Sequence, residues 1–299
     1  MTQVPPLYTT EFGTSGPQVV FLPGLGATTR YWQGYLNALK QSNRVLLVDL
    51  IGFGQSPKPW TRYTVERHIA ALHQILHERG PFTLVGHSMG TLLALAYTAR
   101  YPEQVERLVL LSVPYFGSKD KAVDYLGSHS ALYRLVLSNM ALAAITCIVT
   151  RRILGRVMFY FRPDLPREVA ADIVKHTWRS FTSSLWEVIY NYDVKQEVDT
   201  LDTRIPVFCL HGEQDRVAPL DGILTLAAER TNWSVQVLSD VDHHPLFRAP
   251  GLSKKPKRGK FESIAKKKGF LALLLSILAY RTLPFLLFKV NQIKERILP

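Results

Sequence analysis

Cysteine and acidic residues are scarce in this 299-residue chain, which has two cysteines and 24 Asp and Glu against 36 Lys and Arg. Cys147 and Cys209 are far apart and lack the spacing of metal ligands. They are predicted to be buried core thiols, and they give no sign of a metal site or of an oxidising compartment. The hydrophobic fraction of 47% is typical of a globular protein.

The positive charge is distributed unevenly along the chain. The formal net charge is +12, and residues 254–268 carry eight basic side chains against a single acidic one, Glu262. Because the remainder is only mildly basic, the sequence argues against a nucleic-acid-binding surface. Residues 1–6 show no basic region followed by an apolar run, so no secretory signal is expected and a cytoplasmic location is predicted.

Short apolar runs alternate with helical segments in the first part of the chain and return near its end. The runs are 19–22, 45–48, 82–85, 108–111, 205–210 and 234–238, and the first helical segments are 65–78 and 91–100. Near-continuous apolar strands separated by helices predict an α/β fold with a mostly parallel central sheet flanked by helices.

The alternation stops between residues 114 and 203, where the pattern is mostly helical. This interruption predicts a helical cap insertion within the sheet. The expected division is a core in two parts, 1–113 and 204–250, the cap at 114–203, and a basic linker with an apolar C-terminal helix or tail at 251–299.

The sequence Gly86-His87-Ser88-Met89-Gly90 follows one predicted strand and precedes a predicted helix. A Gly-x-Ser-x-Gly turn in this context holds its serine in a strained conformation, with the hydroxyl at the tip. Side chains at positions 86 and 90 would collide where strand and helix pack closely. A serine alone is a weak nucleophile, so a hydrolytic role requires a base and an orienting acid downstream.

Candidates for both groups follow later strands. Asp215 comes after the run at 205–210, and His243 comes after the run at 234–238. The chain order is therefore Ser, Asp, His, each at the end of a predicted strand. His244 competes with His243 for the base. The aspartates at positions 240 and 242 are alternative acids, but both lie too close to the histidine in sequence to come from a separate strand end.

Five motifs in order resemble the α/β-hydrolase fold superfamily, in its cap-bearing esterase, lipase and epoxide-hydrolase-like branch. They occupy residues 21–26, 49–56, 86–90, 211–215 and 243–245, and the resemblance covers residues 5–250. Two positions depart from the family pattern. Pro23 stands where a histidine is common, and Asp242 replaces the usual glycine.

The resemblance implies a role for each candidate residue. It assigns Ser88 as the nucleophile, His243 as the general base and then acid, and Asp215 as the group that orients the imidazole. The backbone N–H groups of Leu25 and Met89 would form the oxyanion hole. No metal and no organic cofactor is implied. The family places the base two residues before a proline, which favours the first of the two adjacent histidines.

A serine at position 88 favours acyl transfer, whereas relatives with aspartate there perform dehalogenation or epoxide opening. The expected function is a serine hydrolase that cleaves carboxylic esters, including lipid esters or thioesters, through an acyl-enzyme intermediate. A cofactor-free haloperoxidase, a perhydrolase or a C–C hydrolase would use the same residues. A non-catalytic ligand receptor or membrane scaffold with this fold is the alternative of another class.

The expected substrate is a lipophilic ester or acyl compound, since the insertion contains the apolar run 140–149 and many aromatic residues. That run is equally expected as the buried face of a cap helix.

The apolar segment 270–288 is interrupted by Arg281 and Pro284. Three interpretations remain open: an interfacial anchor that binds an anionic membrane surface through residues 254–288, a spanning tail, or a last helix covering the sheet.

Four histidines have no partner pattern and are expected at the surface or in the cap: His68, His73, His77 and His176. His87, beside the serine, is expected to pack without a catalytic role.

Overall fold

The computed structural model describes residues 6–129, 139–149, 151–152, 160 and 165–248. The three interpretations of the C-terminal segment therefore concern residues that lie outside the described ranges. Within these ranges, every helix is too short or too polar to traverse a bilayer.

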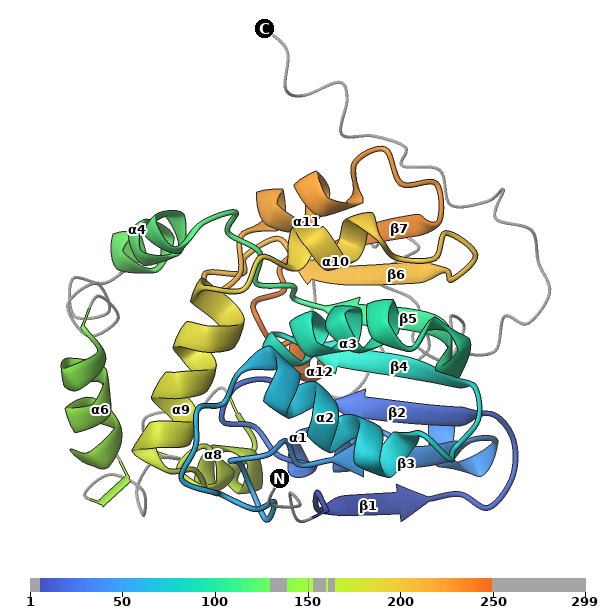
Figure 1. Ribbon diagram of the computed structural model, residues 1–299, viewed down its shortest axis with the longest axis horizontal. Coiled ribbons are helices and arrows are strands. Elements are labelled where there is room, and N and C mark those ends of the chain that lie inside the picture. The colour runs from blue at the N-terminus through green and yellow to red at the C-terminus, as the bar shows by residue number, and fades with distance from the viewer. Residues whose placement is uncertain (1–5, 130–138, 150, 153–159, 161–164, 249–299) are drawn as a thin grey trace, which may run out of the picture.

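The centre of the molecule is a seven-stranded sheet in the order β1-β3-β2-β4-β5-β6-β7 (Figure 1). Every neighbouring pair is parallel except β1 with β3. The strands are β1 (Thr9–Phe12), β2 (Gln18–Leu22), β3 (Arg44–Val48), β4 (Phe82–His87), β5 (Val105–Leu111), β6 (Val207–Gly212) and β7 (Trp233–Leu238). The predicted mostly parallel α/β sheet is confirmed, and each of the six apolar runs contains or overlaps a strand.

Helices cover both faces of the sheet, because alternate strand residues point to opposite sides. In β2, Val20 and Leu22 join one buried cluster, while Val19 and Phe21 join the other. The first face is covered by α2 (Val65–Leu76), α3 (Met89–Arg100), α10 (Val194–Asp199) and α11 (Leu220–Ala227) (Figure 1). The second is covered by α1 (Arg30–Gln33), the short 3₁₀ turn at Leu39–Gln41 and α12 (Pro245–Arg248).

The sequences of α2 and α3, both on the first face, explain how far each helix is buried. The Thr64 side chain caps α2 by accepting the Arg67 N–H, and apolar residues at helical spacing bury one side of this helix. In α3 all residues from Met89 to Thr98 are buried, so α3 is the central helix, enclosed on all sides.

The segment between β5 and β6 is helical, and no strand occurs among its described residues. It contains α4 (Lys119–His129), α6 (Met140–Val149), α8 (Arg167–Asp172), α9 (Trp178–Ser184) and a π-helical turn at Leu185–Tyr190. Figure 1 shows α4, α6 and α9 beyond the carboxyl ends of the parallel strands, with α9 nearer the sheet and α6 outside it. The last helix before β6, α10, packs against α3 in the core.

Both cysteines are free and buried, as predicted. Cys209 lies within β6, and burial raises the pKa of its thiol. The Cys147 sulfur, on α6, lies 3.4 Å from Nδ1 of His176, and burial raises the pKa of Cys147 to about 11. Both thiols are therefore protonated at neutral pH.

The expectation that His68 lies at the surface or in the cap is wrong. The residue is on α2 with 1% of its surface exposed, and its Nε2 lies 3.2 Å from the Ser184 hydroxyl of α9. The signal was available in the sequence, because His68 falls on the apolar side of an amphipathic helix. Burial lowers the pKa of His68 to about 3, so its ring is neutral in the folded protein.

His68 makes the stability of the fold depend on pH. In the unfolded chain its pKa returns to about 6.5, so unfolding takes up a proton below that pH. The neutral ring stabilises the fold fully above pH 6.5, and this contribution is lost as the pH falls towards 3. We expect His68→Gln to reduce the fall in unfolding free energy between pH 7 and pH 5 by about 2 kcal/mol, measured by urea denaturation. A His68→Gln variant with the same pH profile as the parent would contradict the prediction.

Candidate active site

Ser88 occupies the sharp turn between β4 and α3, with φ 50° and ψ −122°. Both glycines of the motif are sterically required. A Cβ on Gly86 would lie 2.6 Å from the Gly90 carbonyl oxygen, and a Cβ on Gly90 would lie 2.4 Å from the Leu22 carbonyl oxygen at the end of β2. The Ser88 N–H donates to the Leu111 carbonyl of β5 at 2.9 Å, which fixes the turn to the neighbouring strand.

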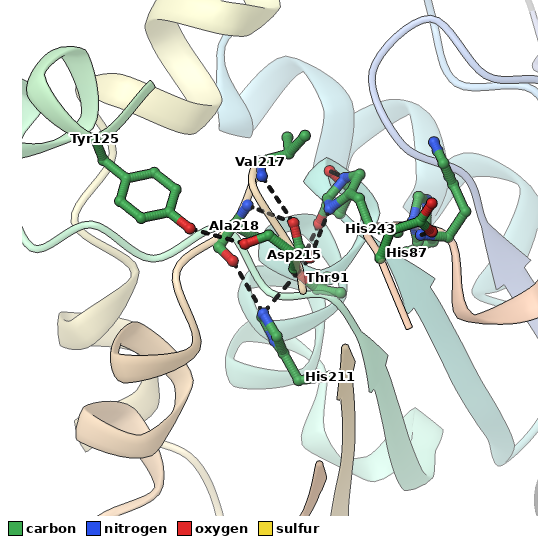
Figure 2. A network of polar contacts seen from close by, with 11 residues as sticks. His87, Thr91, Tyr125, His211, Asp215, Val217, Ala218 and His243 are labelled. Atoms are coloured by element: carbon green, nitrogen blue, oxygen red, sulfur yellow. Dashed lines mark hydrogen bonds and ion pairs between the residues drawn. The ribbon is translucent and has the colours of Figure 1, made fainter. Parts of the chain in front are cut away.

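Three side chains predicted from separate strand ends meet at this turn. Nε2 of His243 lies 3.0 Å from Oγ of Ser88, and Nδ1 of His243 lies 2.8 Å from Oδ2 of Asp215 (Figure 2). Since an ionised carboxylate only accepts hydrogen bonds, Nδ1 carries the proton. The lone pair of Nε2 then faces the serine hydroxyl, which is the arrangement required of a general base.

Asp215 is held as an ion by its surroundings. Its Oδ1 accepts the backbone N–H groups of Val217 and Ala218 at 2.8 and 2.9 Å (Figure 2). Burial alone would raise the pKa of Asp215, but the His243 ring and these two N–H groups outweigh it and lower the pKa to about 2. The carboxylate is therefore ionised throughout the neutral range.

Two further residues hold the loop that carries Asp215. The buried His211 of β6 donates from Nε2 to the Ala218 carbonyl at 3.1 Å, and the same nitrogen lies 3.6 Å from Oδ2 of Asp215 (Figure 2). Burial lowers the pKa of His211, which keeps the ring neutral beside the carboxylate. From the insertion, the Tyr125 hydroxyl donates to the Asp215 carbonyl at 2.8 Å. The sequence pattern gave no signal for the role of Tyr125.

The alternative acids make other contacts. Asp242 accepts two hydrogen bonds from Arg248, at 2.7 and 2.8 Å, and one from the His244 N–H at 3.0 Å. Asp240 accepts from the side-chain amide of Gln214 at 3.3 Å. Of the three aspartates, it is Asp215 whose carboxylate meets the His243 ring.

His87 has a contact that the sequence did not reveal. Its Nε2 donates to the backbone carbonyl of His243 at 2.9 Å (Figure 2). Its ring stacks on Tyr31 with centroids 4.6 Å apart. Burial, and then the neighbouring His243 and His244 rings, hold the pKa of His87 well below its usual value. A neutral ring beside Ser88 thus connects the Ser88 turn directly to the loop that carries His243.

This contact predicts that His87 positions His243. His87→Phe keeps a stacking ring but removes the donor. For the ester hydrolysis expected from the sequence, we predict that kcat falls about 10-fold, the size of one net hydrogen bond, with KM little changed. His87→Gln retains a donor and should recover part of the loss. Steady-state kinetics of both variants measure the effect. An equal fall in kcat for Phe and Gln, or a rise in KM instead, would assign His87 to packing alone.

The loop after β2 runs against the nucleophile turn, as the predicted oxyanion hole requires. A Cβ on Gly24 would lie 3.1 Å from the Ser88 Cβ, which places the neighbouring Leu25 beside the site. Met89 is the first residue of α3, so its N–H has no acceptor within the helix. The assignment of the Leu25 and Met89 N–H groups to an oxyanion hole stays a prediction.

Comparison with known proteins gives relatives in both sequence and structure. The sequence model of the alpha/beta hydrolase fold family matches residues 17–141. The chain is 26% identical over 259 residues to "Probable lysophospholipase BODYGUARD 1" of Arabidopsis thaliana, covering 75% of this chain and 54% of that protein. It is 27% identical over 256 residues to an uncharacterized protein of Mycobacterium tuberculosis, covering 79% and 72%. The chain spans about half the length of the Arabidopsis relative.

Solved structures share the architecture. A thermophilic esterase from Thermogutta terrifontis superposes with a TM-score of 0.62 at 20% identity, over 81% of this chain and 87% of that one. A bromoperoxidase from Bacillus anthracis superposes with a TM-score of 0.61 at 22% identity, over 80% and 88%. At these identities the likeness concerns the fold.

Proposed function

Because this chain is a member of the α/β-hydrolase fold superfamily, we propose that it is a serine hydrolase that cleaves carboxylic esters through an acyl-enzyme intermediate. The observation that carries the proposal is the hydrogen-bonded series from Asp215 through His243 to Ser88, at a turn with positive φ. Positive φ at a non-glycine residue is strained, and such strain is concentrated at functional sites.

The proposed acylation begins when Oγ of Ser88 attacks the ester carbonyl carbon while Nε2 of His243 takes the hydroxyl proton. The carbonyl oxygen becomes an anion, for which the N–H groups of Leu25 and Met89 are the proposed donors. His243 then passes the proton to the leaving alkoxide as the C–O bond breaks. Asp215, ionised by its low pKa, stabilises the imidazolium in between.

The second half returns the enzyme to its first state. Water donates a proton to Nε2 of His243 and attacks the acyl carbon, and the tetrahedral intermediate collapses as Oγ of Ser88 leaves with that proton. The products are the free carboxylic acid and the original hydroxyl. Every proton passes through one nitrogen, so the 3.0 Å approach of Nε2 to Oγ serves both halves.

The proposed substrate is a lipophilic ester, and the proposed role of residues 114–203 is that of a cap. An apolar cluster in the insertion includes Ala122, Ala143, Leu185, Trp186 and Tyr190, and Leu25 and Phe181 pack against it. Phe181 of α9 also reaches within 3.7 Å of the position that a Cβ on Gly26 would occupy. Apolar side chains thus border the loop beside Ser88. The names of the relatives, a lysophospholipase and an esterase, support the same substrate class.

A fluorophosphonate probe tests the proposal without knowledge of the substrate, because it reacts with an activated serine. We expect the probe to add to the peptide that contains Ser88. Ser112→Ala is a matched control: Ser112 ends the neighbouring strand β5, is buried and also has positive φ, at 55°. This variant should label as the parent does. A folded protein that stays unlabelled at Ser88 would favour a ligand receptor or scaffold and overturn the proposal.

A further inference from the structure

Helix α6 is apolar on both sides, but only one side is covered. Ala143 and Cys147 are buried where α6 packs against α9. On the outer side, Met140 is 46% exposed and Ile145 is 56% exposed. The α6 face is defined here by its exposed apolar side chains: Met140, Ile145, Ile148 and Val149. A helix that is hydrophobic all round is normally enclosed, so this face calls for a partner.

In sequence, the segment that contains α6 carries charge of one sign. Residues 125–163 contain no Asp or Glu, and all their Lys and Arg positions are arginines: Arg134, Arg151, Arg152, Arg156 and Arg162. Arg151 and Arg152, just past the end of α6, are exposed. Together with Cys147, Ile148 and Trp178 they line a pocket of about 400 Å³. Guanidinium groups match phosphate oxygens in geometry and charge, and here they adjoin an apolar wall.

Neighbouring groups extend this pattern. Burial, with the added repulsion of Arg151 and Lys175, holds the pKa of Lys58 below its usual value, although Asp49 opposes the shift. Arg151 therefore lies close enough to Lys58 to repel it, whereas Lys175 is paired with Asp172 at 2.6 Å. Trp60 is 75% exposed and packs edge-on against Trp178. Exposed tryptophan beside basic residues is typical of surfaces that meet the boundary between water and lipid.

The position of α6 leaves the α6 face accessible to an extended surface. Figure 1 shows α6 as the outer layer of the insertion, on the side of α9 away from the sheet. An apolar face alone would suit a second copy of the chain or another protein equally well. The adjoining arginines, in a segment without a carboxylate, favour a surface that presents phosphates.

We propose that the α6 face docks on an anionic phospholipid bilayer, with Ile145 and Ile148 at the acyl boundary and Arg151 and Arg152 on lipid phosphates. This inference does not depend on the chemistry at Ser88. It places the outer helix of the insertion, rather than the C-terminal segment, in contact with the membrane.

A fluorophore placed on the α6 face tests the contact. The environment-sensitive dye NBD is attached to Ile145→Cys in the full chain, and the parent protein serves as the labelling blank because Cys147 and Cys209 are buried. Vesicles of phosphatidylcholine with phosphatidylglycerol should shift the emission to the blue, and vesicles of phosphatidylcholine alone should not. The same dye on Arg204→Cys, whose native side chain is 89% exposed just before β6, at the amino ends of the strands, should not respond.

Each other outcome overturns the proposal. If the protein sediments with anionic vesicles while the dye at position 145 stays unchanged, another part of the chain makes the contact. If it does not sediment with them at all, there is no docking. A blue emission that rises with protein concentration in the absence of lipid would identify a second copy as the partner.

A charge-matched pair of variants isolates the arginines. Arg151→Gln with Arg152→Gln should weaken binding to anionic vesicles about 30-fold, since each basic residue near such a surface contributes roughly 1 kcal/mol. Arg44→Gln with Arg204→Gln removes the same charge at the amino ends of β3 and β6, away from α6, and should have a much smaller effect. An equal loss would mean that net charge alone drives binding, and the proposal would fail.

Catalysis and docking are separated in the same set. Both arginine pairs should hydrolyse a water-soluble short ester as the parent does, and Ser88→Ala should still bind vesicles. The docking experiment can therefore be interpreted even if the hydrolase proposal fails. The activity measurements can likewise be interpreted if docking is not observed.

Discussion

Ser88→Ala is expected to lower kcat for a short p-nitrophenyl ester by about 10⁶-fold, because removal of a catalytic serine abolishes the covalent route. Without Oγ, His243 has no hydroxyl within reach and no acyl-enzyme forms. The residual rate would come from binding and the proposed oxyanion donors alone. KM should change little, since the hydroxyl contributes little to holding the substrate. Steady-state kinetics, with circular dichroism to verify folding, measure the effect.

The control for Ser88→Ala is again Ser112→Ala, which removes a buried hydroxyl from a residue with similarly positive φ at the next strand end. Its kcat should remain within a few-fold of the parent value. If Ser88→Ala left ester turnover unchanged, the serine hydrolase proposal would be wrong.

Asp215→Asn carries the second large expected effect, a fall in kcat of about 10⁴-fold. The side-chain amide can offer an N–H to Nδ1 of His243, which moves the ring proton to Nε2. That nitrogen then faces Ser88 as a donor and cannot take the hydroxyl proton. The His243 ring keeps its position but carries its proton on the wrong nitrogen. The fall in kcat should therefore be large while the change in melting temperature is small.

Two other aspartates serve as controls for Asp215→Asn. Asp240→Asn and Asp242→Asn carry the same chemical change at the positions that compete with Asp215 in the sequence. Their carboxylates contact Gln214 and Arg248, so kcat should change by less than a few-fold. A fall of about 10⁴-fold in either of them, with Asp215→Asn unaffected, would reassign the acid.

Sequence reasoning was reliable where an element is buried on both sides. Strands β2 to β6 lie inside the sheet and must be apolar along most of their length, so each was visible as a short run. β7 is an edge strand that is mostly half-buried, but its alternating valines and leucine still marked it. β1 was missed because it is an antiparallel edge strand, Thr9–Phe12, that is only partly buried and carries two threonines and a glutamate. The turn around Ser88 could be predicted because local sterics dictate its glycines.

The sequence by itself determined the α/β architecture, the sharp turn at Ser88 and the order of the three candidate groups, because periodicity and glycine sterics act between near neighbours. Only the tertiary structure shows that the Asp215 carboxylate contacts the His243 ring. It also shows that His87 donates to the His243 carbonyl and Tyr125 to the Asp215 carbonyl. These contacts join residues 28 to 156 positions apart. They depend on how loops leave their strands, which no local pattern of residues encodes.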